Sequence, residues 1–190
     1  MEISLIRHGK SKHTDNNVIT CTQFKDWVEK YDHIGVFEEK SYPTKTVRTI
    51  STAKLVISSD LERSTASVKL LNSNVKTISI PIFRETTLPT PKTALWGMES
   101  RPSTWALIFR CLWFSGYVTA DCESYRIAKN RAREASALLV DYAQKYTSIV
   151  LVGHGFINLL IAKELKSNGW KGNRRPSSKH WGCTTYTLNL

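Results

Sequence analysis

The sequence predicts an α/β fold, with three layers in which a mainly parallel sheet is covered by helices on both faces. Short apolar runs with the character of buried strands end at polar or glycine-containing loops, and most of these loops lead into helical patterns. The chain has 190 residues, of which 41% are hydrophobic. A chain of this length buries about 70% of its unfolded surface, so we expect a single domain over residues 1–190.

The first half of the sequence predicts strand, loop and helix in that order. Residues 3–6 form an apolar run that ends at an Arg-His-Gly loop, and a second run covers residues 53–57. Apolar residues then recur at helical spacing over residues 61–71. Ser59 or Asp60 is available as the N-cap of this helix. The pattern is that of a buried strand joined to a surface helix.

The second half continues the alternation. Apolar and polar residues alternate over 75–82, which predicts a third strand. Residues 125–146 contain no Gly or Pro and predict a long helix. The apolar run at 148–152 is typical of a fully buried parallel strand, and a helix is predicted over 156–166. A β-rich tail, residues 184–190, ends the chain.

Two stretches, residues 38–52 and 84–102, lack clear periodicity, and we expect the second to decorate the ligand crevice. The most apolar stretch, residues 105–118, is interrupted by Arg110 and is shorter than the roughly 20 residues that span a bilayer. We interpret the aromatic group in this region as core or dimer interface more readily than as a cap over the substrate. Its members are Trp96, Trp105, Trp113 and Phe114.

The composition points to an anionic partner without naming it. The formal charge is +11, which attracts phosphorylated metabolites, nucleic acid or acidic membranes. A basic cluster near the C-terminus is interpreted as a solvated face that could also receive an acidic substrate or partner. It contains Lys171, Arg174, Arg175 and Lys179.

The cysteines and the N-terminus indicate a cytoplasmic protein. Cys21, Cys111, Cys122 and Cys183 are widely spaced and match no disulfide framework, so we expect reduced thiols. The first residues reach Arg7 after a few apolar positions, which excludes a signal peptide of the usual kind.

Three residues with the chemistry of phosphate recognition each follow a predicted strand. His8 and His154 come directly after strands, and Arg63 opens the helix after another. In parallel sheets, ligands bind beyond the carboxyl ends of the strands, so we expect these side chains to share one crevice. A neutral imidazole can attack phosphorus to give a phosphohistidine, and nearby cations stabilise the transferred phosphoryl group.

The same positions carry a family resemblance. The segment Leu5–Ser11 resembles the R-H-G signature of the histidine phosphatase superfamily, which includes the cofactor-dependent phosphoglycerate mutases. The segment Ser58–Ala66 resembles the second arginine motif of that family, with Ser64 in place of Ala. The segment Val152–Gly155 resembles its second histidine motif. Three ordered motifs within residues 3–160 are far more specific than any one of them.

The resemblance implies a phosphoglycerate mutase-like fold and a set of roles. His8 is implied as the nucleophile and a phosphate ligand, and Arg7, Arg63 and His154 complete the phosphate pocket. The resemblance also implies that His154 is a catalytic residue. Glu85, in Phe-Arg-Glu after the third strand, is nominated as the proton donor. The family chemistry needs no metal and no other cofactor.

The chain also departs from the family pattern. The aromatic and glycine residues expected after the acid are replaced by Thr86–Pro91, so Asp60 and Glu99 stay open as alternative acids. The Asn common after R-H-G is displaced by His13-Thr14-Asp15, with Asn16 or Asn17 as substitutes. We interpret His13, His33 and His180 as structural or surface residues.

The function that the sequence predicts is therefore hydrolysis of a phosphomonoester through a phosphohistidine on His8. The expected partner is a small anionic phosphorylated substrate, with no nucleic acid and no membrane. The nearest alternative is a mutase-type phosphotransferase, although Lys10 stands where the glycolytic mutases carry an acidic residue. The other alternative is a catalytically silent module that binds phosphate or nucleic acid. The substrate and the oligomeric state stay open.

Overall fold

The computed structural model describes residues 1–71, 75–93 and 97–189. Within these ranges the main sheet has five strands in the order β4-β3-β6-β1-β7. Neighbouring strands are parallel except for β7, which runs antiparallel to β1. The predicted mainly parallel sheet is confirmed. Its strands are β1 (Glu2–Arg7), β3 (Leu55–Ser58), β4 (Thr77–Ser79), β6 (Ser148–Gly153) and β7 (Cys183–Thr187).

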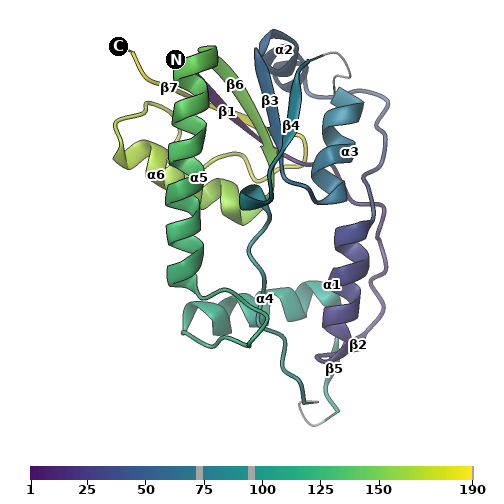
Figure 1. Cartoon of the computed structure of the whole chain (residues 1–190). Coiled ribbons are helices and arrows are strands. Elements are labelled where there is room, and N and C mark those ends of the chain that lie inside the picture. Colours follow the sequence, from purple (N-terminus) through teal and green to yellow (C-terminus); the bar gives the residue numbers. More distant parts are fainter. Residues whose placement is uncertain (72–74, 94–96, 190) are drawn as a thin grey trace.

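Helices cover both faces of this sheet, as predicted for a three-layer fold (Figure 1). Because successive side chains of a strand point to opposite faces, each strand feeds two separate cores. Leu5 and Leu151 belong to the core under α5 (Tyr125–Tyr146) and α6 (Gly155–Ser167). Ile6 and Val152 belong to the core on the opposite face. That face is covered by α2 (Thr44–Thr52) and α3 (Glu62–Leu71).

A third, smaller core lies beyond the carboxyl ends of the parallel strands, in the lower half of Figure 1. It joins α1 (Gln23–His33) to α4 (Pro102–Phe114) through the buried rings of Phe24, Trp105 and Phe109. A two-stranded ribbon, β2 (Ile19–Thr20) with β5 (Glu99–Ser100), adjoins it. This part of the chain stands over the edge of the sheet where the predicted site residues lie.

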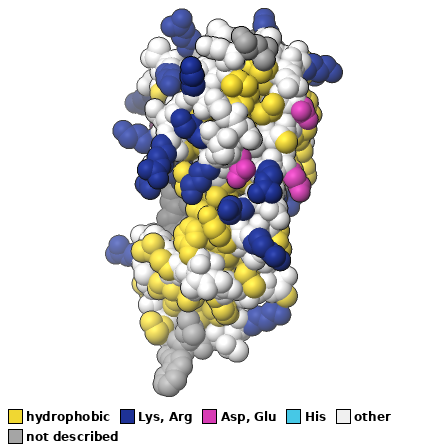
Figure 2. Space-filling view, turned by 90° about the vertical axis from the view of Figure 1, so that its left-hand side faces the viewer, with side chains coloured by type: hydrophobic (Ala, Val, Ile, Leu, Met, Phe, Trp, Pro, Cys, Tyr) yellow, Lys and Arg dark blue, Asp and Glu magenta, His cyan; other side chains and the backbone are white. Residues whose placement is uncertain are grey.

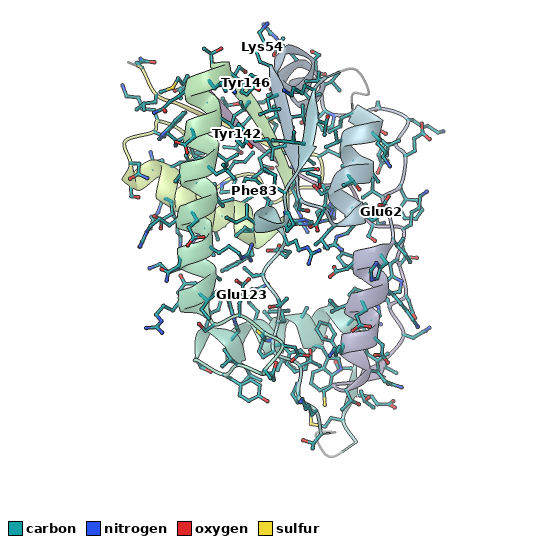
Figure 3. All side chains as sticks on the ribbon, viewed as in Figure 1. Lys54, Glu62, Phe83, Glu123, Tyr142 and Tyr146 are labelled. Carbon is teal, nitrogen blue, oxygen red and sulfur yellow. The ribbon has the colours of Figure 1, made fainter. Side chains whose placement is uncertain are left out.

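Several element boundaries differ from the prediction. The strand predicted at 75–82 is shorter, because Pro81 opens a 3₁₀ turn, η1 (Pro81–Phe83), which places Phe83 beside α5 (Figure 3). The long helix at 125–146 is confirmed residue for residue. Three helices were missed, α1, α2 and α4. α2 lies within 38–52 and α4 overlaps the apolar stretch 105–118. No helix was predicted at α1, although its apolar residues recur at helical spacing.

The aromatic group divides between core and surface. Trp105 and Trp113 are buried, as expected of core residues, whereas Phe114 is 51% exposed. Trp96 and the last residue of the predicted tail, Leu190, lie outside the described residues. Figure 2 shows basic side chains gathered over the upper part of one face and hydrophobic side chains over the lower part. None of the helices that the structure describes is long and apolar enough to cross a membrane.

Candidate active site

His8 lies at the carboxyl end of β1 with only 3% of its surface exposed. Its Nδ1 is 2.7 Å from the carbonyl oxygen of Gly9. Since a carbonyl can only accept, Nδ1 carries the proton and Nε2 keeps its lone pair. A Cβ at Gly9 would lie 2.0 Å from the ring of Trp181, so the loop has room only for glycine. The local geometry therefore presents His8 with a free nucleophilic nitrogen.

Burial and positive charge keep this imidazole neutral. Desolvation, followed by the charges of Arg63 and Arg7, lowers the pKa of His8 from 6.5 to about 3, although the bond to the Gly9 carbonyl opposes the shift. A neutral imidazole at physiological pH is the state that can attack phosphorus.

His154 faces His8 from the end of β6, with the two ring centroids 5.0 Å apart. The His154 ring is fully buried, and its Nε2 lies 2.6 Å from the hydroxyl of Ser59. Desolvation, with the neighbouring His8 and Arg63, holds the pKa of His154 well below 6.5. In this neutral ring the Ser59 hydroxyl can donate to Nε2, which leaves the proton on Nδ1.

Arg63 reaches the same place from the first turn of α3 and is 2% exposed. Its Nη1 donates to the backbone oxygen of Tyr31 at 2.8 Å and to Oδ1 of Asp32 at 2.6 Å. The guanidinium also lies over the Tyr31 ring, 4.1 Å from its centroid. Three contacts from α1 therefore fix the orientation of Arg63.

Arg7 completes the group at the end of β1. Its Nη1 donates to the backbone oxygen of Ser178, which anchors the guanidinium on the C-terminal segment. Its Nε lies near the start of α6, where a Cβ built on Gly155 would be 3.6 Å away. The structure thus brings Arg7 close to the helix N-terminus that follows His154.

Three predicted phosphate ligands share one feature. Arg7 Nε, Arg63 Nε and His154 Nδ1 are each buried without a hydrogen-bond partner among the described residues. Buried polar groups in folded proteins are nearly always paired, so an unpaired set at one place needs an explanation. A phosphoryl group has oxygen acceptors for such donors. In the described part of the chain, no three His, Cys, Asp or Glu side chains gather closely enough to hold a metal ion.

Glu85 lies at the N-terminus of α6. Its Oε2 accepts the backbone N–H of Phe156 at 2.8 Å, and its Oε1 accepts that of Ile157 at 3.0 Å. A Cβ on Gly155 would be 3.8 Å from Glu85 Oε2 and 3.6 Å from Arg7 Nε, so both side chains adjoin this glycine. Arg131 of α5 holds the preceding segment by donating to the carbonyls of residues 82 and 84.

The alternative acids are placed less favourably. Both oxygens of Asp60 accept from Arg84 at 2.6 Å, which lowers the pKa of this carboxyl and keeps it engaged. Glu99 lies in the exposed ribbon strand β5. Of the three carboxylates, Glu85 is the one that lies at the start of α6, beside Gly155.

Ser64, which departs from the family pattern, has a structural role. Its hydroxyl donates to the carbonyl of Val152 at 2.5 Å and accepts from the backbone N–H of Ser59 at 3.1 Å. Similarly, the hydroxyl of Ser67 accepts from the backbone N–H of Gly9 at 2.9 Å. These bonds tie the loops that carry His8, Arg63 and His154 to one another.

The sequence led us to interpret His180 as a structural or surface residue, whereas the structure places it beside His8. Its ring centroid is 5.5 Å from that of His8, on the C-terminal segment that also bonds Arg7. Tyr31 and Asp32, which hold Arg63, were also missed, because α1 was not predicted. The position of His180 beside His8 is visible only in the structure, where the C-terminal segment returns to β1. His33 is on the exposed surface of α1.

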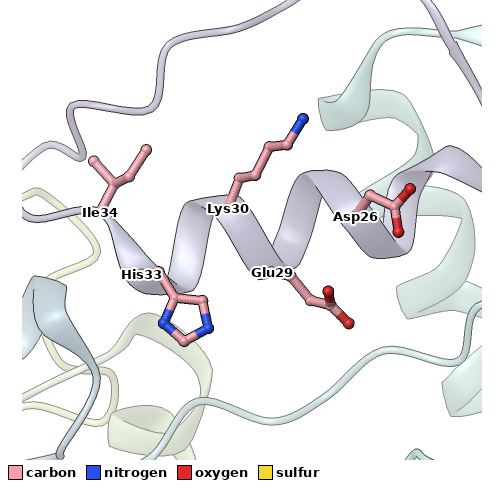
Figure 4. Close-up of a pocket in the computed structure, with 5 residues that line it drawn as sticks. All are labelled: Asp26, Glu29, Lys30, His33 and Ile34. Atoms are coloured by element: carbon pink, nitrogen blue, oxygen red, sulfur yellow. The ribbon is translucent and has the colours of Figure 1, made fainter.

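Two hollows lie near α1. A cavity of about 370 Å³ is lined by the segment after Gly9, by α1 and α4, and by His180. A larger one of about 510 Å³ lies along α1 and contains Glu29 and His33, which extend to the same side of the helix (Figure 4). The first cavity adjoins the site, because Tyr31 lines it and also contacts Arg63.

Comparisons with known proteins agree with this architecture. No family model matches the sequence, and no curated protein matches it. Among solved structures, the phosphoserine phosphatase from Entamoeba histolytica with 3-phosphoglyceric acid is 16% identical, with a TM-score of 0.57 over 97% of this chain and 89% of that one. Mycobacterial hydrolase 2 is 16% identical, with a TM-score of 0.59 over 100% and 89%.

A third structure, the alpha-ribazole phosphatase from Shigella flexneri, is 20% identical and has a TM-score of 0.51 over 86% of this chain and 79% of its own. These proteins belong to the histidine phosphatase superfamily. The chain therefore has the same phosphoglycerate mutase-like α/β fold as these structures.

Proposed function

We propose that this protein is a phosphatase that hydrolyses a small anionic phosphomonoester through a phosphohistidine on His8. The observation that carries the proposal is the set of three unpartnered nitrogens, on Arg7, Arg63 and His154, around a neutral imidazole. The names of two structural neighbours, a phosphoserine phosphatase and an alpha-ribazole phosphatase, support hydrolysis of phosphate esters.

In the first step, Nε2 of His8 attacks phosphorus and the bond from phosphorus to the ester oxygen breaks. Glu85, in its protonated form, gives its proton to the departing oxygen, so an alcohol leaves. The guanidinium groups of Arg7 and Arg63 and the Nδ1–H of His154 donate to the transferred phosphoryl oxygens. The N-terminus of α6 adds a positive dipole end on the same side.

In the second step, water attacks the phosphohistidine and inorganic phosphate leaves. Glu85 is then ionised and accepts the proton of the attacking water, which returns it to its starting state. His8 regains its lone pair. The sequence of steps is balanced without a metal ion or another cofactor, and we propose that none is used.

A mutase would keep the phosphohistidine and transfer the group to a second hydroxyl. Such a reaction uses the same first step, so it stays the closest alternative. A catalytically silent module that binds phosphate or nucleic acid is less well supported. Such a module would not need the hydrogen bond from His8 Nδ1 to the Gly9 carbonyl, which leaves Nε2 with the lone pair. We place the activity in the cytoplasm.

The test is turnover of p-nitrophenyl phosphate and a panel of phosphorylated metabolites in the presence of EDTA. Rapid quenching during turnover should trap an acid-labile, base-stable phosphate on the protein. The variant His8→Ala should lose both turnover and the trapped phosphate, whereas His33→Ala on exposed α1 should keep both. Full activity in His8→Ala would rule out the mechanism, and a strict need for added Mg²⁺ or Zn²⁺ would replace it with metal-assisted hydrolysis.

A further inference from the structure

The segment that carries His180 is fastened to the end of β1. The backbone N–H of Trp181 donates to the carbonyl oxygen of Arg7 at 3.0 Å. The backbone N–H of Arg7 in turn donates to the carbonyl oxygen of Gly182 at 3.2 Å. The ring of His180 joins this set, because its Nδ1 lies 3.0 Å from the carbonyl oxygen of His8. Nδ1 must be the donor in this bond, so Nε2 is the nitrogen left to meet a ligand.

Trp181, the residue after His180, has an unusual backbone conformation. Its φ is +60°, in the left-handed region that non-glycine residues rarely adopt. The hydroxyl of Thr46 in α2 donates to its carbonyl at 2.6 Å, and its indole ring packs against Gly9. Strained residues of this kind persist where the surroundings over-determine them, often at functional sites. The position of His180 is therefore fixed by several independent contacts.

His180 lines the cavity of about 370 Å³ beside the site, together with Lys10 and His13. His13 Nε2 is buried without a hydrogen-bond partner among the described residues. Asp15 is the acidic residue of the lining, and its Oδ1 accepts the backbone N–H of Asn17. The lining of this cavity thus contains one ammonium group and two imidazoles against one carboxylate.

We propose that Lys10, His13 and His180 form a second anion-binding site next to the phosphoryl pocket, so that the substrate is a phosphomonoester with a further anionic group. This inference rests on the proposed function for the phosphoryl end of the substrate. The further group is a carboxylate or a second phosphate, since both offer charged oxygens to these donors. An ester whose leaving group is uncharged lacks the partner for this site.

Binding at this site couples to the protonation of His180. Desolvation, together with the charges of Arg7 and Lys10, lowers the pKa of His180 in the free protein, while the bond to the His8 carbonyl and the charge of Glu39 oppose the shift. An anion beside the ring favours its charged form, so the complex takes up a proton. Affinity for the second anionic group should therefore rise as the pH falls.

The experiment compares two ligands that differ only at the second group. The inhibition constants of 3-phosphoglycerate and glycerol 3-phosphate are measured against turnover of p-nitrophenyl phosphate. We expect 3-phosphoglycerate to bind about tenfold more tightly, as a charge-assisted hydrogen bond allows. Fructose 1,6-bisphosphate and fructose 6-phosphate form the matching pair for a second phosphate. The preference is the ratio of the two inhibition constants within a pair, and the pair with the larger ratio shows whether the second anionic group is a carboxylate or a phosphate.

Variants then assign the preference to the residues. Lys10→Ala and His180→Gln should each reduce the preference several-fold, whereas the exposed neighbour Lys12→Ala should leave it unchanged. In the wild type the preference should increase from pH 7.5 to pH 5.5. His180→Gln keeps an amide donor for the His8 carbonyl but does not titrate, so its preference should change less with pH than that of the wild type.

Equal inhibition by both members of both pairs would overturn the proposal, as would a preference that survives in Lys10→Ala and His180→Gln. If no ester is turned over, the proposed phosphatase function fails. The second site is then tested by calorimetric titration of the same ligand pairs into the wild type and the two variants. A preference lost in the variants supports the site, and no preference overturns it.

Discussion

Asp32 at the end of α1 accepts a hydrogen bond of 2.6 Å from Nη1 of Arg63, the arginine of α3 that we assign to phosphate binding. The Arg63 side chain is 2% exposed and that of Asp32 is 34% exposed. The pair connects a helix outside the three layers to the phosphate pocket. Among the described residues, Arg63 Nε has no hydrogen-bond partner.

The two roles of Asp32, holding Arg63 and neutralising its charge, can be separated. Asp32→Asn keeps an acceptor oxygen but removes the negative charge, so tungstate should inhibit several-fold more tightly. Asp32→Ala also removes the acceptor, so KM should rise about tenfold while kcat changes less. The exposed Asp26→Asn on the same helix is the control. If the two Asp32 variants had the same tungstate inhibition and the same KM, the proposed separation of the two roles of Asp32 would be wrong.

Oxyanions should compete with the substrate for the pocket. We expect phosphate, vanadate and tungstate to inhibit competitively, and Arg63→Ala to weaken this inhibition by about tenfold or more, because charge-assisted contacts are lost. Steady-state inhibition at several substrate concentrations provides the measurement. Arg133→Ala, on an exposed part of α5, should behave as the wild type does. Unchanged inhibition in Arg63→Ala would remove this arginine from the phosphate site.

The contribution of Glu85 should depend on the leaving group. Glu85→Gln should slow phosphorylation by alkyl phosphates about 10² to 10⁴-fold, the usual range for general acid catalysis. With p-nitrophenyl phosphate the same step should slow far less, because nitrophenolate leaves without a proton. Single-turnover rates isolate this step from phosphohistidine hydrolysis.

Glu85 also accepts two backbone N–H groups of α6, so the thermal stability of Glu85→Gln is needed beside its kinetics. Gln retains one carbonyl oxygen for these donors. Equal slowing of both substrates, or of neither, would move the acid to Asp60 or Glu99 and leave the other assignments in place.

The buried histidines should make the protein less stable in acid. The pKa of His8 is about 3 in the folded protein and 6.5 without its surroundings, and the pKa of His154 is lowered in the same direction. Above pH 6.5 both states are neutral. Between pH 6.5 and 3 the unfolded chain protonates His8 and the folded chain does not, so this residue lowers the free energy of unfolding by at most about 1.4 kcal/mol per pH unit. His154 adds a loss in the same direction.

Urea unfolding at pH 7.5 and pH 5.0 measures this effect. His8→Asn should lose less stability than the wild type between the two pH values, because one of the protonation sites has been removed. A loss as large as in the wild type would show that His8 is not the group responsible. The exposed His33→Asn should match the wild type.

The sequence by itself determined the sheet and the central residues of the site. The strands that end at Arg7, Ser58 and Gly153 are so apolar that they have to be buried, and a parallel arrangement brings their carboxyl ends together. Local pattern was also sufficient for α5, whose composition is free of Gly and Pro. The proposed nucleophile His8, the second histidine and Arg63 were named from motifs that lie at these strand ends.

The tertiary structure decided what surrounds these residues. Helix α1 has an amphipathic sequence, but only the tertiary structure shows that it supplies Tyr31 and Asp32 to hold Arg63. His180 reaches His8 because β7 pairs antiparallel to β1, which returns a segment 172 residues away to the nucleophile. Contacts between segments so distant leave no periodicity in the sequence, because they depend on strand pairing and not on local propensity.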